Sequence, residues 1–147
     1  MAYNIHVVIL NTHRNALFEV VEQVVWYNAN GGIWTNTSDT RTLTINGSGT
    51  SGALRFRNPK NGEEFFVPLG IDSDVRWCDL VMDLGPGDTA MKIEPQYYDS
   101  SGIYVNARES HLPKATKRSS KGTEVNVVYT DEDPVKKEYQ VSIAISG

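Results

Sequence analysis

The chain has 147 residues, 39% hydrophobic and 22% charged, and this length and composition predict one globular domain over residues 1–147. Its formal net charge of −4 argues against a protein that binds nucleic acid by neutralising many phosphates. Cys78 is the only cysteine, which excludes an intramolecular disulfide.

The cellular location of the protein is predicted from two kinds of segment that the sequence lacks. The opening sequence MAYNIH has neither the basic region nor the apolar block of a signal peptide. No later segment approaches the run of about twenty apolar residues that a membrane-spanning helix needs. We therefore expect a cytoplasmic protein.

Alternation of apolar and polar residues recurs along the chain, beginning with Tyr3, Ile5 and Val7 against Asn4 and His6. This period of two is typical of strands with one buried face. The same pattern, interrupted by clusters of turn-forming residues, predicts further strands at residues 41–45, 53–57, 64–69, 124–129 and 139–145. Many short strands with turn signals between them predict a mainly β fold, either a sandwich or a barrel.

Residues 74–84 depart from this pattern and predict a helix. Apolar residues recur there at the i, i+3, i+4 and i+7 spacing of a helical stripe, at Trp77, Leu80, Val81 and Leu84. Asp72 or Ser73 is suited to cap the first turn, and the following GPG sequence to end the helix. A second, shorter helix is predicted at residues 103–110.

The sequence GSGTSG at residues 47–52 has the spacing of a dinucleotide-binding fingerprint. That fingerprint depends on a helix N-terminus, whereas strand alternation resumes directly after these residues. The segment is then either a plain turn or a place where a ligand approaches the backbone. In the second case Ser48, Thr50 and Ser51 offer hydroxyls and Gly49 an N–H.

A second small-residue loop, NANGG at residues 28–32, lies between Trp26 and Trp34. Amides, bare backbone and aromatic rings together suit a sugar, which needs paired donors and acceptors and a flat apolar surface. The alternative is an ordinary turn flanked by core aromatics.

Signals of catalysis are weak. The three histidines are far apart and show no metal-ligand spacing, and no nucleophile elbow occurs. The carboxylates Glu63, Glu64 and residues 131–133 could serve a glycosidase, but polar turns of this kind are usually solvated. The basic stretch at residues 114–121 is likewise predicted to be a solvated loop. We expect no catalytic residue, no metal site and no cofactor.

Five strings match one known family in order, over nearly the whole chain. They are ANGG-x-W at 29–34, GSGTSG-x-LRF at 47–56, RWCD at 76–79, Q-x-Y at 96–98 and ARE at 107–109. Together they resemble the fungal fruit-body lectins. The resemblance implies an actinoporin-like antiparallel β-sandwich with a short helix-loop-helix element between its sheets. It also implies a cytoplasmic homotetramer that binds glycans.

The resemblance implies two sugar sites, of which the first takes galactose-β1,3-N-acetylgalactosamine, the T-antigen disaccharide. Its predicted residues here are Ala29, Asn30, Ser48, Gly49, Asp72 and Ser73. Asp72 and Ser73 stand where the family has a His-Asn pair, so we expect binding to persist with altered selectivity.

The second implied site takes N-acetylglucosamine, and its predicted residues are Asp79, Leu80, Met82 and Tyr104. Met82 stands where the family has a Thr, Tyr104 where it has an Arg, and Ala115 where it has a Tyr. These replacements remove a hydroxyl, a guanidinium and an aromatic platform. We expect this site to be weakened, altered or lost.

The alternative function is membrane attack, because actinoporin pore-formers resemble this family in fold. Those toxins look alike in inserting an N-terminal amphipathic helix, whereas the N-terminus here alternates as a strand. We therefore expect a lectin that meets membranes only through their glycans.

Overall fold

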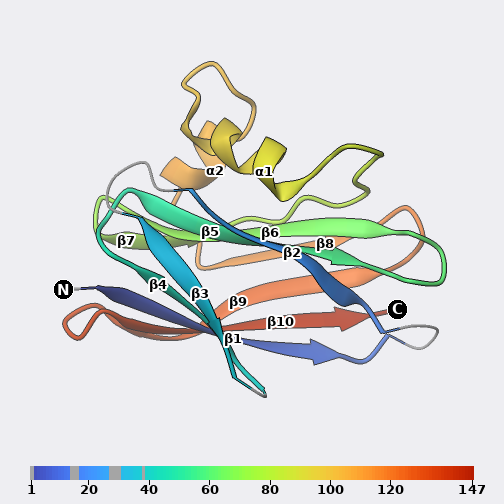
Figure 1. Ribbon diagram of the computed structural model, residues 1–147, viewed down its shortest axis with the longest axis horizontal. Helices are drawn as coiled ribbons and strands as arrows, with labels where there is room; N and C mark the ends of the chain where they lie inside the picture. Colours follow the sequence, from blue (N-terminus) through green and yellow to red (C-terminus); the bar gives the residue numbers. More distant parts are fainter. Residues whose placement is uncertain (1, 14–16, 27–30, 38) are drawn as a thin grey trace.

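The computed structural model describes residues 2–13, 17–26, 31–37 and 39–147. Two β-sheets pack face to face, and a short helical segment covers the outer face of the smaller one (Figure 1). The larger sheet has the order β3, β4, β1, β10, β9, β8, with bounds Gly32–Asn36, Arg41–Ile45, Tyr3–Asn11, Glu138–Ser146, Glu124–Asp133 and Lys114–Arg118. The smaller sheet has the order β2, β5, β6, β7, with bounds Glu19–Trp26, Thr50–Arg57, Glu64–Asp72 and Val75–Cys78. The predicted mainly β sandwich is confirmed.

All six strands predicted from alternation are present, and β1 has the expected buried face of Tyr3, Ile5 and Val7. The sandwich is not purely antiparallel, because β1 pairs in parallel with β10 and antiparallel with β4. These two parallel strands lie near opposite ends of the chain, so no hairpin constrains their direction. The predicted opening strand is thus present, and it lies inside the larger sheet.

The main core fills the space between the sheets. It joins side chains of the larger sheet, such as Ile5 and Ile143, to side chains of the smaller sheet, such as Leu54. The rings of Phe56 and Phe65 stack with their centroids 4.6 Å apart. Each fully buried side chain of this size contributes about 1.5–3 kcal/mol to stability, so this core holds the two sheets together.

Strand β6 is buried on both of its faces, which is why its sequence EFFVPLGID is apolar almost throughout. Phe65 and Val67 face the core between the sheets, while Phe66 faces outward into a second cluster. A second cover is required on that side, since an apolar sheet face of this kind is unstable in water.

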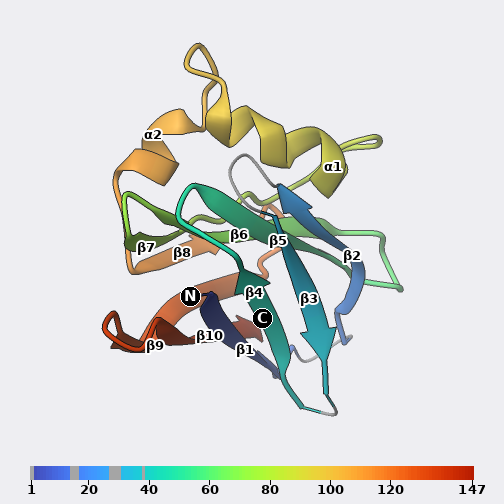
Figure 2. The same cartoon turned by 60° about the vertical axis from the view of Figure 1, so that its left-hand side comes forward.

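Three helical elements supply this cover: α1 (Ala90–Ile93), the 3₁₀ helix η1 (Glu94–Tyr98) and α2 (Val105–Glu109). Ala90, Ile93 and Tyr97 pack on the outer face of the smaller sheet. Figure 2 shows the helical segment above β5 and β6. Helix α2 confirms the helix predicted from the local pattern at residues 103–110, whereas α1 and η1 were expected only as part of the helix-loop-helix element that the family resemblance implies. Along the chain, this helical element connects β7 of the smaller sheet to β8 of the larger sheet. In space it covers the outer face of the smaller sheet and does not lie between the two sheets (Figure 2).

The helix predicted over residues 74–84 is wrong. Strand β7 pairs there with β6, and Val81 forms an isolated bridge with Phe66. The apparent helical stripe divides between two surfaces, because Trp77 packs in the outer cluster and Leu80 in the core between the sheets. Ser73 has a φ of 51° in the tight turn between β6 and β7, a conformation that an N-cap does not adopt.

Two further findings concern the surface. The basic stretch predicted as a loop forms the edge strand β8, on which Lys114, Lys117 and Arg118 are exposed. Charged residues on an edge strand discourage pairing with other chains. Across the described ranges, no helix is long and apolar enough to cross a bilayer.

Candidate functional site

Two turns meet at one end of the smaller sheet. The turn from β4 to β5 carries Ser48, and the turn from β6 to β7 carries Ser73 and Asp74. The N–H of Asp74 donates to the Ser48 hydroxyl at 2.9 Å, which fastens one turn to the other. The structure therefore brings together Ser48, Gly49, Asp72 and Ser73, four of the six residues predicted for the galactose-type site.

Ala29 and Asn30, the other two predicted residues, lie outside the described residues. The positions that flank them are described. Trp26, at the end of β2, pairs with Ser51 of β5, and Gly31 accepts a hydrogen bond of 3.0 Å from the N–H of Asn46. Both flanking positions thus lie beside the segment that carries Ser48.

Not every polar group of residues 47–52 is available to a ligand. Thr50 and Ser51 are 0% exposed, so the expectation that their hydroxyls face a ligand is wrong. The N–H of Gly49 donates to the carbonyl of Ile71 at 2.8 Å and is not free either. Ser48 is half-buried, and its hydroxyl keeps a proton to donate while it accepts from Asp74.

The Asp72 carboxylate is held in place from both sides. One oxygen accepts from Arg108 at 2.5 Å and the other lies 2.8 Å from Nε2 of His111. Arg108 is itself fixed, because its Nε donates to the carbonyl of Tyr97 at 2.7 Å and its guanidinium lies 4.8 Å from the centre of the Tyr98 ring. Asp72 is therefore a rigid acceptor at the site, anchored by residues more than thirty positions away in the sequence.

A buried polar chain supports these turns from below. The Tyr98 hydroxyl donates to Ser51 at 2.8 Å, and the Ser51 hydroxyl donates to a carboxyl oxygen of Glu94. Glu94 is 1% exposed, and burial raises its pKa to about 8. Sequence reasoning missed Glu94, because a lone acidic residue carries no local signal of burial.

The second predicted site is only partly assembled. Asp79 accepts from the Tyr97 hydroxyl at 2.7 Å, and the Tyr104 ring stacks on Tyr97 with centroids 4.9 Å apart. Leu80 is 0% exposed inside the core between the sheets, so its side chain is not accessible to a sugar. Met82 packs partly buried against that core. The accessible polar groups of this site are therefore those of Asp79 and Tyr104.

Over the ranges that the structure describes, no group of three or more His, Cys, Asp or Glu side chains is placed to hold a metal ion. The residues after the GSGTSG sequence form β5, so the helix that a dinucleotide fingerprint requires is replaced by a strand, as predicted.

A sandwich whose surface turns present rigid hydroxyl and carboxylate groups belongs to the class of β-sandwich binding proteins. The family model described as fungal fruit body lectin matches residues 1–141. The chain belongs to this family of lectins, which are carbohydrate-binding proteins and not enzymes.

Individual relatives agree with this assignment. The chain is 45% identical to the Boletus edulis lectin over 113 residues, which are 77% of this chain and 78% of that protein. The crystal structure of the wild-type Xerocomus chrysenteron lectin superposes with a TM-score of 0.92 at 40% identity, covering 99% of this chain and all of that one. A mutated form of the same lectin superposes with a TM-score of 0.93.

Proposed function

We propose that this lectin binds galactose- and N-acetylgalactosamine-type glycans, and in particular the T-antigen disaccharide. Ser48, Gly49, Asp72 and Ser73 form the site, together with Ala29 and Asn30. The observation that carries this proposal is the contact of 2.9 Å between Asp74 and Ser48, which makes one continuous polar surface from two separate turns. Residues 1–147 act as one lectin domain.

Selectivity at this site depends on Asp72 and Ser73. A carboxylate accepts hydrogen bonds but donates none, so Asp72 favours sugar hydroxyls over the carbonyl of an acetamido group. Because Arg108 and His111 hold its two oxygens, Asp72 has little freedom to adapt to another sugar. We expect galactose to contribute more of the affinity than N-acetylgalactosamine does.

The second, N-acetylglucosamine-type site is weak, altered or lost in this proposal. The Asp79 carboxylate already accepts from Tyr97, and Leu80 offers no accessible side chain. Tyr104 and Ala115 bring neither the guanidinium nor the aromatic platform that the family resemblance implies at their positions.

We further propose that the chain acts as a homotetramer, because single shallow sugar sites bind weakly and several sites per assembly supply avidity. A cytoplasmic location and a role in defence accompany this proposal as predictions. In this proposal the protein contacts membranes only by binding their glycans.

The decisive experiment is titration calorimetry with the T-antigen disaccharide on the wild-type protein and a Ser48→Ala variant. Loss of the hydroxyl is expected to cost about 1 kcal/mol of binding free energy, a roughly five- to tenfold weaker Kd. Ser120→Ala is the matched control, since Ser120 bonds Asp83 beside the β8–β9 turn. Absence of wild-type binding, on a glycan array and by calorimetry, would refute the proposal.

The alternative function, membrane attack, has its own test. Dye release from sugar-free lipid vesicles is expected to stay at background. The described N-terminal residues are paired on both sides in the larger sheet, and no free amphipathic helix begins there. Rapid release at micromolar protein would favour pore formation instead.

A further inference from the structure

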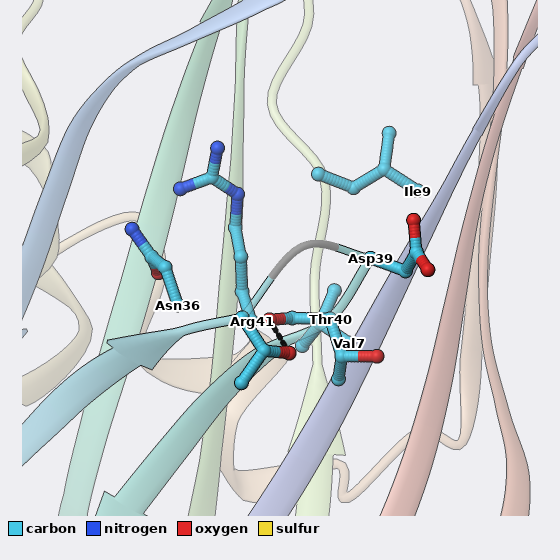
Figure 3. A pocket seen from close by; sticks show the side chains of 7 residues that line it. Val7, Ile9, Asn36, Asp39, Thr40 and Arg41 are labelled. Atoms are coloured by element: carbon cyan, nitrogen blue, oxygen red, sulfur yellow. Dashed lines mark hydrogen bonds between the residues drawn. The ribbon is translucent and has the colours of Figure 1, made fainter.

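A surface pocket of about 260 Å³ lies at the far end of β3 and β4 from the turn that carries Ser48. Figure 3 shows it from close by. Its lining includes Ile9, Asn36, Thr37, Asp39, Thr40 and Arg41. Pockets for larger organic ligands begin at about 300 Å³, so this one is suited to a single saccharide ring.

Strand register explains why these side chains converge. Arg41 pairs with Asn36 of β3 on one side and with Val7 of β1 on the other. Directly paired residues point to the same face of a sheet, so the three side chains form a row across three strands. In Figure 3, Arg41 and Asn36 extend to one side of the pocket, whereas Asp39 and Ile9 lie across from them.

Arg41 differs from the other described arginines in its charge balance. Arg55, Arg57, Arg76, Arg108 and Arg118 each have a carboxylate within 4 Å. Across the described chain, Arg41 has no ion pair and donates only to the neutral side-chain oxygen of Gln23. Burial lowers the pKa of Arg41, whereas for Arg55 the effect of burial is outweighed by the hydrogen bonds to Glu22 and Glu64, which raise its pKa.

A half-buried guanidinium with no ion-pair partner is a strong binding site for a planar anion, because the carboxylate oxygens of such a ligand accept from its fork of N–H donors. The rest of the pocket suits a sugar. Asn36 and Thr40 supply amide and hydroxyl groups, and Ile9 supplies an apolar patch for a C–H face. Asp39 on the opposite side disfavours a ligand with several negative charges.

We propose that this pocket is a separate binding site for an acidic monosaccharide unit, such as a sialic or uronic acid, whose carboxylate pairs with Arg41. Asn36 and Thr40 bind the hydroxyls of its ring. The site is independent of the galactose-type site, because the two lie at opposite ends of β4. In this proposal the lectin binds a neutral sugar at one end of β4 and an acidic sugar at the other end.

The test is an NMR titration of the ¹⁵N-labelled full chain with the α-methyl glycoside of N-acetylneuraminic acid. The methyl ester of its carboxyl group serves as the uncharged counterpart. The acid is expected to shift the backbone amides of Thr37 and Thr40, and the ester to bind at least tenfold more weakly. Binding of the acid is expected to weaken as ionic strength rises, because its charge contact is near the surface.

Variants separate the roles of the two charges. Arg41→Gln is expected to weaken binding of the acid tenfold or more, since a charge-assisted hydrogen bond is lost. Asp39→Asn is expected to strengthen it, because a like charge is removed. Arg118→Gln, on the edge strand β8 at the other side of the larger sheet, removes the same charge and is expected to change nothing. Unchanged affinity for the T-antigen disaccharide would confirm that each variant is folded.

Several results would overturn the proposal. Equal affinity for acid and ester would exclude carboxylate recognition, and weaker binding in Asp39→Asn would mean that Asp39 receives the ligand. Competition by acetate at the same concentration as the sugar would reduce the pocket to a simple anion site. If Arg41→Gln does not fold, Arg41→Lys replaces it, with intermediate affinity expected because charge is kept and the fork is lost.

Discussion

Single residues beneath and around the two turns determine the properties of the proposed galactose-type site. Glu94 is buried and does not reach the surface, yet it accepts a hydrogen bond from the Ser51 hydroxyl. Ser51 in turn accepts from the Tyr98 hydroxyl, so Glu94 helps to hold both side chains in place. Asp72 is held by Arg108 and His111, so its orientation depends on two groups that are distant in the sequence. The residues of this site therefore lead to predictions that can be tested by substitution.

The first prediction concerns Glu94 and pH. Burial raises its pKa from 4.5 to about 8, so the folded protein binds a proton that the unfolded chain releases. The stability contributed by the protonated group is fully present below pH 4.5 and is lost as the pH rises through 8. Glu94→Gln is expected to flatten the decline of unfolding free energy over this window, measured by urea denaturation.

The control for this titration is Glu109→Gln. The Glu109 side chain is 60% exposed, so its substitution is expected to leave the pH profile of stability unchanged. A Glu94→Gln profile that declines as steeply as that of the wild type between pH 5 and 8 would show that another group titrates.

The second prediction concerns Ser73, which stands where the family resemblance implies an Asn. Its φ of 51° lies in the left-handed region, which Asn tolerates better than other residues with a side chain. Ser73→Asn is therefore expected to leave the melting temperature unchanged or slightly raised. The added amide donor is expected to improve affinity for N-acetylgalactosamine about three- to tenfold, measured by calorimetry.

Ser73→Ala separates the new donor from the loss of the hydroxyl, because Ala brings neither group. If Ser73→Asn and Ser73→Ala bind N-acetylgalactosamine equally, position 73 does not contact the acetamido group.

At the scale of elements, the helical segment is held to the smaller sheet by few large contacts. Ile93 and Tyr97 pack on Phe66 and Trp77, and the Tyr97 ring lies 5.3 Å from that of Trp77. The short helices have little stability of their own, so this packing keeps Glu94 and Tyr98 beneath the site.

The third prediction tests this dependence. Ile93 is 4% exposed, and Ile93→Ala is expected to cost about 2–5 kcal/mol of unfolding free energy, measured by urea denaturation. Met91→Ala is the matched control, since Met91 in the same helix is 66% exposed and its loss is expected to cost little. Equal effects of the two variants would mean that the helical cover contributes no packing energy.

On the scale of the whole molecule, the outer face of the larger sheet carries an apolar patch. Val8 and Leu10 are 41% and 50% exposed on β1. Leu10 pairs with Ala144 on β10, and Ser142 of the same strand pairs with Val128 on β9. Exposed apolar side chains on an uncovered sheet face favour association with another chain.

The fourth prediction follows for the proposed tetramer. Sedimentation is expected to give the mass of four chains of 16.4 kDa for the wild type and a smaller species for Leu10→Asp, because a buried unpaired charge opposes association. Val135→Asp is the control, since Val135 is 85% exposed in the turn between β9 and β10. A wild-type protein that sediments as a single chain would contradict the tetramer.

Local patterns were sufficient for much of this fold. The alternation along β1, β4 and β10 predicted strands because one face of each is buried and the other is wet, which is a property of neighbouring residues. The five strings between residues 29 and 109 together indicated the family, which the family model confirms, and the fold and the lectin class followed from it.

Tertiary structure alone decided what those patterns left ambiguous. Residues 75–78 became a strand instead of a helix because β6 needed a partner and because Trp77 and Leu80 fill cores on opposite sides of the sheet. The burial of Ser51, the anchoring of Asp72 by Arg108 and the unpaired charge of Arg41 depend on residues that approach only in the folded chain. Their charges and hydrogen bonds are therefore settled by long-range contacts, which no local spacing encodes.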